Sequence, residues 1–146
     1  MYTDKTARVV LTMGGFDPDN LNERANGGWT PLLWFIVQGN VAMVRYLISR
    51  GADGRQTDVH GLFPMFLAAL VGCLEIMKLL SRDGGAHEDI WRLDIFGRSP
   101  LNIALERGRF NVVYWLIRNG ALESRDDVDG GLNDAIMRRD LRLRDY

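Results

Sequence analysis

The chain has 146 residues, 47% hydrophobic and 25% charged, which is the composition of a single folded domain and excludes disorder as its main state. Its 18 Lys and Arg residues nearly balance its 19 Asp and Glu residues, giving a formal net charge of -1. So small a charge creates no long-range field for nucleic acid or for an anionic membrane, and we expect neither as a partner.

Cysteine usage and apolar runs indicate the compartment. Cys73 is the sole cysteine and cannot form an internal disulfide, and with His60 and His87 it does not supply a structural zinc site. The apolar run at 9–11 is too short for a signal-peptide core, and no run approaches the roughly 18 apolar residues that cross a membrane. We therefore expect an intracellular and, most simply, cytoplasmic protein that holds no metal or other cofactor.

A proline and a set of glycines recur in a fixed register along the chain. Three prolines lie at intervals of 33 and 36 residues, and each is three residues after one glycine and eight before a second. The second glycine is twelve residues before a third. This register predicts three copies of one structural unit. The prolines are Pro31, Pro64 and Pro100, and the glycines are Gly28, Gly39, Gly51, Gly61, Gly72, Gly84, Gly97, Gly108 and Gly120.

Each unit begins with a short helix. Proline suits the first helical position, and Thr30 or Ser99 just before it can cap the helix with a side-chain oxygen. Phe63 stands at the same place in the second unit and has no such oxygen, so the second unit is expected to be the least well capped. Left-handed glycines are expected to end these helices. They are Gly39, Gly72 and Gly108.

A second helix follows each short one. Its apolar residues recur at the i, i+3, i+4 spacing of a buried stripe, as Val44, Leu47 and Ile48 do in the first unit. One helical hairpin cannot bury both of its faces, so the units are expected to stack. The predicted second helices span residues 41–49, 74–81 and 110–117.

The two ends of the chain depart from the unit. Residues 3–15 predict the second helix of a partial unit, with Val9, Val10 and Met13 facing the core. Residues 126–146 predict a divergent cap, and polar, atypical ends are what keeps a stack of repeats soluble.

The register resembles that of the ankyrin repeat, a 33-residue unit of a β-turn and two helices with a Thr-Pro-Leu-His signature. Segments 47–53 and 116–122 resemble the end of the family's second helix. The resemblance implies an all-α ankyrin-repeat solenoid of stacked helix-turn-helix units with β-turn fingers, in a single domain. Its expected parts are a partial N-terminal repeat (1–25), repeat 1 (26–58), repeat 2 with a long finger (59–94), repeat 3 (95–125) and a C-terminal cap (126–146).

Several positions depart from the family's pattern. The signature histidine is replaced in all three repeats, although Asn102 together with Ser99 could restore its hydrogen bonds. Phe35 stands where the family usually has alanine, so repeat 1 is expected to repack or tilt. The long segment between Gly84 and Gly97 carries Trp91. This tryptophan is either a partner contact or a lid folded over the core.

The sequence contains no phosphate-binding or nucleophile-elbow motif, and we expect no catalytic activity. A catalytic alternative would require a deep polar pocket with titratable groups.

The resemblance implies instead that a protein or peptide docks in a concave groove between the fingers and the first helices. Many residues at the matching positions are apolar, which is unusual for exposed surface. Trp29, Phe96, Arg98 and Arg107 are the candidate anchors, because Trp and Arg often dominate interface energy. Leu70 and Val71 could instead fold inward. The predicted binding residues are Trp29, Val37, Gln38, Val59, His60, Leu62, Leu70, Val71, Ile95, Phe96, Arg98, Glu106 and Arg107, with Asn26, Gly27, Asp129 and Gly131 at the same line of positions.

The apolar strip leaves a second function open. It could drive self-association, or the chain could be a structural unit or a part of a longer array. We expect the chain to be a monomer in preference to a homodimer.

Overall fold

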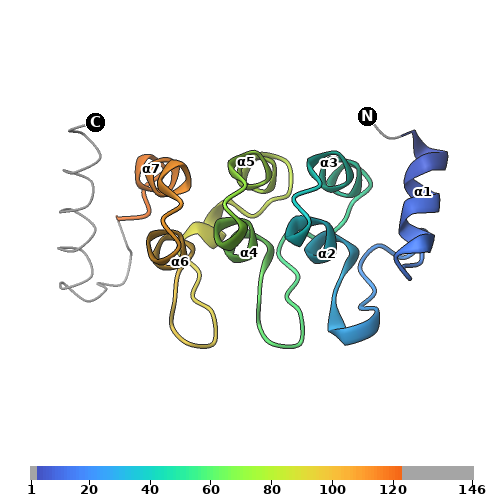
Figure 1. The fold of residues 1–146 in the computed structure, drawn as a ribbon, viewed down its shortest axis with the longest axis horizontal. Helices are drawn as coiled ribbons and strands as arrows, with labels where there is room; N and C mark the ends of the chain where they lie inside the picture. Colours follow the sequence, from blue (N-terminus) through green and yellow to red (C-terminus); the bar gives the residue numbers. More distant parts are fainter. Residues whose placement is uncertain (1–2, 123–146) are drawn as a thin grey trace.

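The computed structural model describes residues 3–122, and the predicted C-terminal cap lies outside them. Every regular element in this range is helical, as the sequence predicts. Two layers of helices stack side by side, with loops that project beyond one layer (Figure 1). The α-helices are α1 (Asp4–Met13), α2 (Pro31–Val37), α3 (Val41–Ser49), α4 (Pro64–Val71), α5 (Leu74–Arg82), α6 (Pro100–Glu106) and α7 (Phe110–Arg118), and the short 3-10 helices are η1 (Asn26–Gly28) and η2 (His87–Ile90).

The first helices begin as predicted. The Thr30 hydroxyl accepts a hydrogen bond from the Leu33 N–H at 3.2 Å at the start of α2. Ser99 and Asn102 form a reciprocal capping box at the start of α6. Phe63 makes no side-chain cap at α4. The second unit is therefore the one whose first helix starts without a side-chain hydrogen bond.

The turns between the paired helices also follow the prediction. Gly39, Gly72 and Gly108 have φ values of 67°, 85° and 69°. A side chain would be strained in this left-handed region, so glycine lets the chain reverse at once into the second helix.

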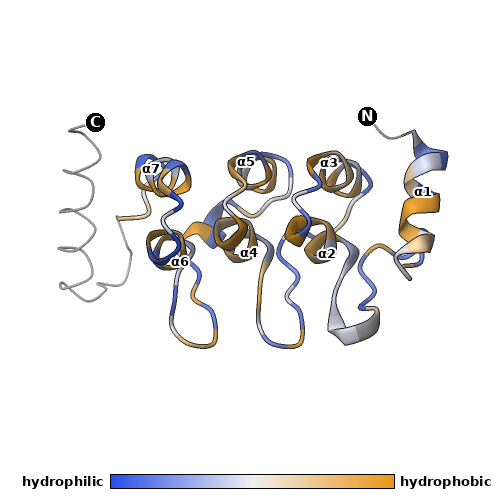
Figure 2. Cartoon of the chain, viewed as in Figure 1, coloured by the Kyte–Doolittle hydropathy of each residue, from blue (hydrophilic) through white to orange (hydrophobic). Residues whose placement is uncertain are grey.

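The core runs along the interface between the two layers. Helix α4 packs against both α2 and α6, and its residues from Pro64 to Ala69 are all buried. Hydrophobic residues concentrate on the helices while the loops carry most of the polar ones (Figure 2). In the second helices the first two residues of each predicted stripe are fully buried, while the third is partly exposed. The fully buried pairs are Val44 and Leu47, Met77 and Leu80, and Val113 and Leu116.

Phe35 is accommodated by an aromatic cluster at the N-terminal end of the stack. It is 3% exposed, and its ring centroid lies 6.5 Å from that of Phe16. Phe16 also meets Trp34 edge to face at 6.2 Å. The loop after α1 thus supplies an aromatic partner for the larger residue.

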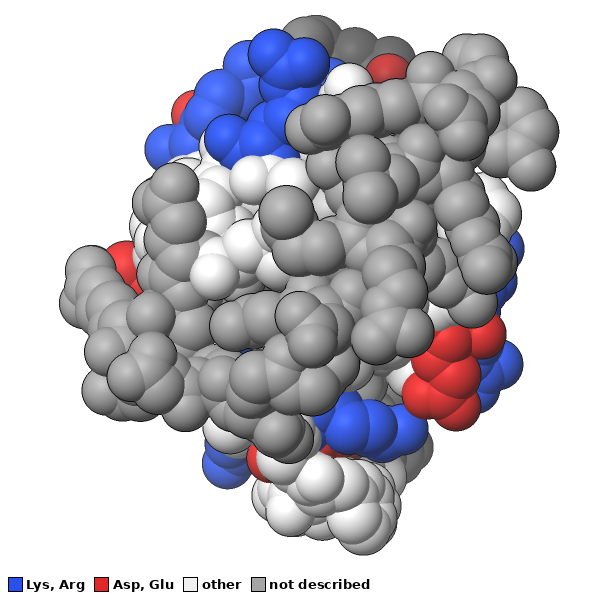
Figure 3. Space-filling model, turned by 90° about the vertical axis from the view of Figure 1, so that its left-hand side faces the viewer, with Lys and Arg blue, Asp and Glu red and all other residues white. Residues whose placement is uncertain are grey.

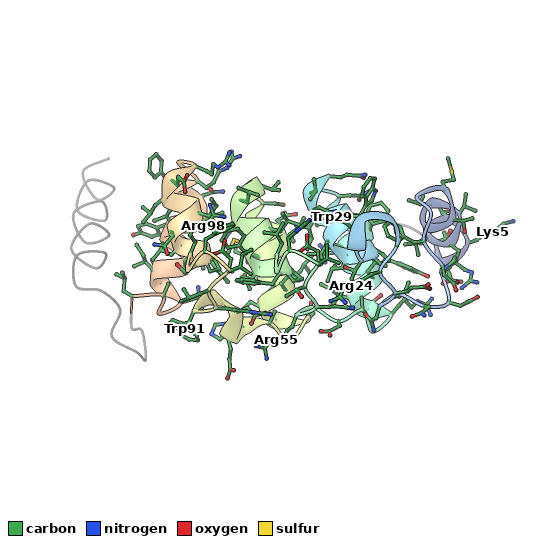
Figure 4. All side chains as sticks on the ribbon, turned by 90° about the horizontal axis from the view of Figure 1, so that it is seen from below. Lys5, Arg24, Trp29, Arg55, Trp91 and Arg98 are labelled. Atoms are coloured by element: carbon green, nitrogen blue, oxygen red, sulfur yellow. The ribbon has the colours of Figure 1, made fainter. Side chains whose placement is uncertain are left out.

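The prediction for the core face of α1 is wrong for Val9 and Met13, whereas Val10, the third predicted residue, packs partly on the core. Ala7 and Leu11 are the buried residues of this helix, whereas Val9 is 52% and Met13 83% exposed. Helix α1 is seen from the side in Figure 1 and end-on in Figure 4, the reverse of the other α-helices, so it crosses the end of the stack. In this crossed orientation, the side of α1 that carries Ala7 and Leu11 faces the core, and the side that carries Val9 and Met13 faces outward.

Replacing Phe63 with threonine sets capping against burial. Threonine can supply the missing cap, which contributes about 1 kcal/mol in other helices. Phe63 is fully buried, however, and removing such a side chain costs about 3–5 kcal/mol. We expect Phe63→Thr to lower the free energy of unfolding by about 2–4 kcal/mol in urea denaturation followed by circular dichroism.

The matched control is Thr30→Val, which removes a cap from α2 and keeps the shape of the side chain. We expect it to lower the unfolding free energy by about 1 kcal/mol. A Phe63→Thr protein as stable as the wild type would show that capping outweighs burial at this position.

Candidate functional site

Three fingers precede the first helices, and they share one backbone turn. The fingers span residues 25–29, 58–62 and 94–98. In each, the N–H of the first residue donates to the carbonyl of the fifth, at 2.8, 3.0 and 2.8 Å. The fourth residue of each finger is a left-handed glycine. We call the surface formed by these fingers and the first helices the finger face.

Consecutive fingers touch through apolar side chains. A Cβ added to Gly61 would lie 2.7 Å from a methyl group of Ile95, and Val59 lies in the same way against Gly28. The absence of a side chain at these glycines therefore lets each finger rest on the one before it. Val59 is still 63% exposed and Ile95 67% exposed.

None of the predicted binding residues is fully buried. Phe96, at 75% exposure, is the most exposed of the large apolar side chains among them. Leu70 packs partly on the core, in the direction that the inward alternative predicted. Asp129 and Gly131 lie outside the described residues. The exposed residues of this set are Val37, Gln38, Val59, His60, Ile95, Phe96, Glu106 and Arg107. The partly buried ones are Trp29, Leu62, Leu70, Val71 and Arg98.

An aspartate that the sequence analysis did not select holds the third finger together. Asp94 accepts hydrogen bonds from the N–H groups of Phe96 and Arg98 at 2.9 and 2.8 Å through Oδ1. Its Oδ2 accepts a hydrogen bond from Nε of Arg98 at 3.0 Å and forms an ion pair with Nη2 of the same guanidinium at 2.9 Å. The Arg98 guanidinium also lies 5.4 Å from the ring centroids of Phe66 and Phe96. Arg98, a predicted anchor, is thus already paired within the chain.

Asp58 is the matching residue of the second finger. Its Oδ1 accepts from the N–H groups of His60 and Leu62 at 2.8 and 2.9 Å. The fifth residue of this finger is Leu62, which has no side-chain donor, and Asp58 Oδ2 is buried without a hydrogen-bond partner. The position of both aspartates, three residues before the finger glycine, is the sequence signal that could have identified them.

The long segment before the third finger ties adjacent units together. Asp89 is fully buried and pairs with Arg55 at 2.9 Å and with Arg92 at 3.5 Å. The Trp91 indole N–H donates to the Gly120 carbonyl at 2.9 Å, and its side chain packs partly on the core. These contacts support the lid interpretation of Trp91. In Figure 4, Arg55 and Trp91 lie along one edge of the molecule, apart from Trp29 and Arg98.

One further pair of reactive side chains lies near this segment. Ser81 Oγ and His87 Nδ1 are 2.7 Å apart, and both residues are on the surface. The His87 ring meets Trp91 edge to face at 5.9 Å. A serine nucleophile needs a histidine that a third group orients, and we assign this exposed pair no catalytic role.

Residues 3–122 bring together no group of three or more His, Cys, Asp or Glu side chains that could hold a metal ion. Over the same range no helix has the length and apolar character needed to span a bilayer. At the end that carries α7, basic and acidic side chains form separate small patches in the visible part (Figure 3).

The charge on Asp94 gives a pH-dependent test of the finger structure. Burial raises the pKa of Asp94, but hydrogen bonds from the Arg98 N–H, the Arg98 guanidinium and the Phe96 N–H outweigh burial and hold this pKa below its ordinary value. A carboxylate with a lowered pKa in the folded state stabilises that state above its unfolded pKa, and the contribution disappears as the pH falls through the folded pKa.

We therefore expect Asp94→Asn to lower the free energy of unfolding by about 2 kcal/mol between pH 5 and pH 7. The difference from the wild type should begin to narrow below about pH 4, the unfolded pKa, and should disappear as the pH falls through the lower folded pKa, where the folded wild-type carboxylate also becomes neutral. Urea denaturation at several pH values measures both, with Asp83→Asn at an exposed site as the control. A difference that stays constant down to pH 2 would contradict this account of Asp94.

Two models of one repeat family match the sequence. The model "Ankyrin repeats (3 copies)" matches residues 3–90, and the model "Ankyrin repeats (many copies)" matches residues 64–117. The first match includes α1, which places this helix in the repeat pattern even though it crosses the end of the stack.

Curated relatives share the repeats but are much longer. The chain is 40% identical over 73 residues to ankyrin repeat protein nuc-2 of Neurospora crassa, across 50% of this chain and 7% of that protein. It is 29% identical over 119 residues to alpha-latrocrustotoxin-Lt1a of Latrodectus tredecimguttatus, across 82% and 8%. For the putative ankyrin repeat protein YahD of Escherichia coli, the identity is 40% over 70 residues, across 44% and 35%. With its stacked helical pairs, its fingers and these matches, the chain belongs to the ankyrin repeat family.

Proposed function

We propose that this chain is a non-catalytic module that binds a protein or a peptide through its finger face. Ankyrin repeats generally serve protein–protein interaction, and the family is generally non-catalytic. The observation that carries the proposal is the row of exposed apolar side chains on the fingers, formed by Val59, Ile95 and Phe96. Single exposed apolar residues are ordinary, but a contiguous group of them is typical of a binding surface.

The packing of the fingers supports the same proposal. Because Val59 rests on Gly28 and Ile95 on Gly61, the apolar side chains of successive fingers are held at a fixed spacing. A partner then meets a surface that needs little ordering on binding, so a few anchors can provide most of the affinity. Trp29 and Val37 extend the apolar surface toward α2.

Phe96→Ser tests the finger face directly. Phe96 is 75% exposed, so its removal leaves the core intact while taking away the most exposed large apolar side chain on the fingers. We expect at least about tenfold less of a specific partner to be retained than by the wild type in a pull-down from lysate.

Tyr114→Ser is the matched control. Tyr114 is a 42% exposed aromatic residue on α7, in the layer away from the fingers. A partner retained by the wild type and by Tyr114→Ser, but lost by Phe96→Ser, supports the proposal. Equal retention by all three folded proteins would place the binding surface elsewhere.

A second candidate function is self-association through the outer side of α1. Val9 and Met13 are exposed there beside a shallow, mainly apolar depression of about 350 Å³, which Lys5, Arg8 and Pro18 also line. Two such surfaces could pack on each other in a symmetric pair. The charged rim opposes this, because like charges from the two copies would meet.

Sedimentation separates the two functions. We expect the chain to sediment as a monomer at every concentration up to about 100 μM, because the apolar area around Met13 is small compared with stable interfaces of roughly 1,200–2,000 Å². A concentration-dependent dimer that Met13→Asp abolishes and Phe96→Ser leaves intact would establish the second function instead.

A further inference from the structure

The second and third fingers have the same turn but differ in one ion pair. In both, the first residue is an aspartate whose Oδ1 accepts two backbone N–H groups. In the third finger, Arg98 pairs with the remaining oxygen of Asp94. In the second finger, Leu62 takes the place of arginine, and Oδ2 of Asp58 has no partner.

An unpaired carboxylate oxygen is costly at this place. Asp58 is 3% exposed, and Oδ2 itself is buried. Buried polar atoms are nearly always hydrogen-bonded, because water no longer offsets the loss of a partner. Within residues 3–122, Asp58 Oδ2 is the buried side-chain polar atom for which the chain supplies no donor. The chain itself therefore leaves this acceptor without a donor.

We propose that the partner segment carries an arginine that pairs with Asp58 Oδ2 and occupies the place that Arg98 has in the next finger. This inference rests on the proposed function of the finger face. It commits the partner to a peptide segment in which an arginine is flanked by apolar residues.

The third finger shows why arginine fits this carboxylate. Nε of Arg98 donates a hydrogen bond to Asp94 Oδ2 at 3.0 Å, and Nη2 of the same guanidinium lies 2.9 Å from this oxygen in an ion pair. A guanidinium is planar and offers several N–H groups in a fixed arrangement, whereas a lysine ammonium offers a single charged centre. The same turn in the second finger presents Asp58 Oδ2 with no internal guanidinium.

The surroundings of Asp58 match an arginine with apolar neighbours. Val59 and His60 are exposed beside it, and Ile95 of the next finger lies against Gly61. Leu62 is partly exposed on the same finger, and the proposal requires an incoming arginine to displace it in order to reach the buried Oδ2 of Asp58.

An arginine supplied within the chain tests the acceptor without any partner. Leu62→Arg places a guanidinium at the position of Arg98, and we expect it to raise the midpoint of thermal unfolding by about 3 °C. In Asp58→Asn the side chain loses the acceptor Oδ2, so the double variant Asp58→Asn with Leu62→Arg should show none of this gain. If Leu62→Arg is equally stabilising with either residue at position 58, the acceptor is not available and the inference fails.

The partner chemistry is tested with a random 12-residue peptide library displayed on phage, selected on the wild-type chain. We expect the selected peptides to share an arginine flanked by apolar residues. Replacing that arginine with citrulline, which is neutral and has the same shape, should weaken binding at least about tenfold in fluorescence anisotropy, the loss typical of a charge-assisted hydrogen bond. The substitutions Asp58→Asn and Leu62→Arg in the chain should weaken its binding of the arginine peptide by a similar factor.

Asp83→Asn removes one negative charge at an exposed position at the end of α5, so it controls for general attraction between a basic peptide and an acidic chain. Equal weakening by Asp83→Asn and Asp58→Asn would overturn the inference. Peptides that require Phe96 but bind equally well as citrulline forms would leave the finger face as the binding surface and overturn the arginine assignment. Peptides indifferent to both Phe96 and Asp58 would overturn the finger face as well.

Discussion

The whole structure depends on the fact that a first helix cannot be buried by its own second helix. Helix α4 shows this most fully, because its residues from Pro64 to Ala69 are buried on all sides. A helix that is apolar all round needs neighbours all round, and α2, α5 and α6 provide them. Burial of a large apolar side chain such as Met65 or Phe66 contributes about 1.5–3 kcal/mol, so the units stabilise one another and hold the fingers in line.

Local rules explain why so much of this stack could be predicted from the sequence. A proline at the first helical position, a hydroxyl before it and a left-handed glycine after the helix act over a few residues each. The starts of α2 and α6 at Thr30 and Ser99, and the missing cap at Phe63, therefore followed from single positions. The repetition of these signals in register then fixed the stacked architecture.

Contacts between distant residues were the part that the sequence did not reveal. Helix α1 carries two stripes at i, i+4 spacing, Ala7 with Leu11 and Val9 with Met13, and helical periodicity alone does not choose between them. The crossing of α1 over the end of the stack makes that choice. In the same way, the Asp89 pair with Arg55 joins positions 34 residues apart, and no local pattern predicts it.

At the candidate site, the sequence predicted which residues are exposed but not which buried residues hold the fingers in shape. The family register placed exposed residues such as Val59 and Phe96 on the fingers, but it selected side chains that point outward and missed the aspartates beneath them. Asp58 and Asp94 accept the same two backbone N–H groups, so the presence of an ion pair in one finger and its absence in the other come from residues 98 and 62. An oxygen left without a donor disfavours a purely apolar partner and favours one that brings a cation, and specificity is this difference in affinity. On the proposal made above, a leucine in place of an arginine converts a self-contained turn into one that discriminates between partners.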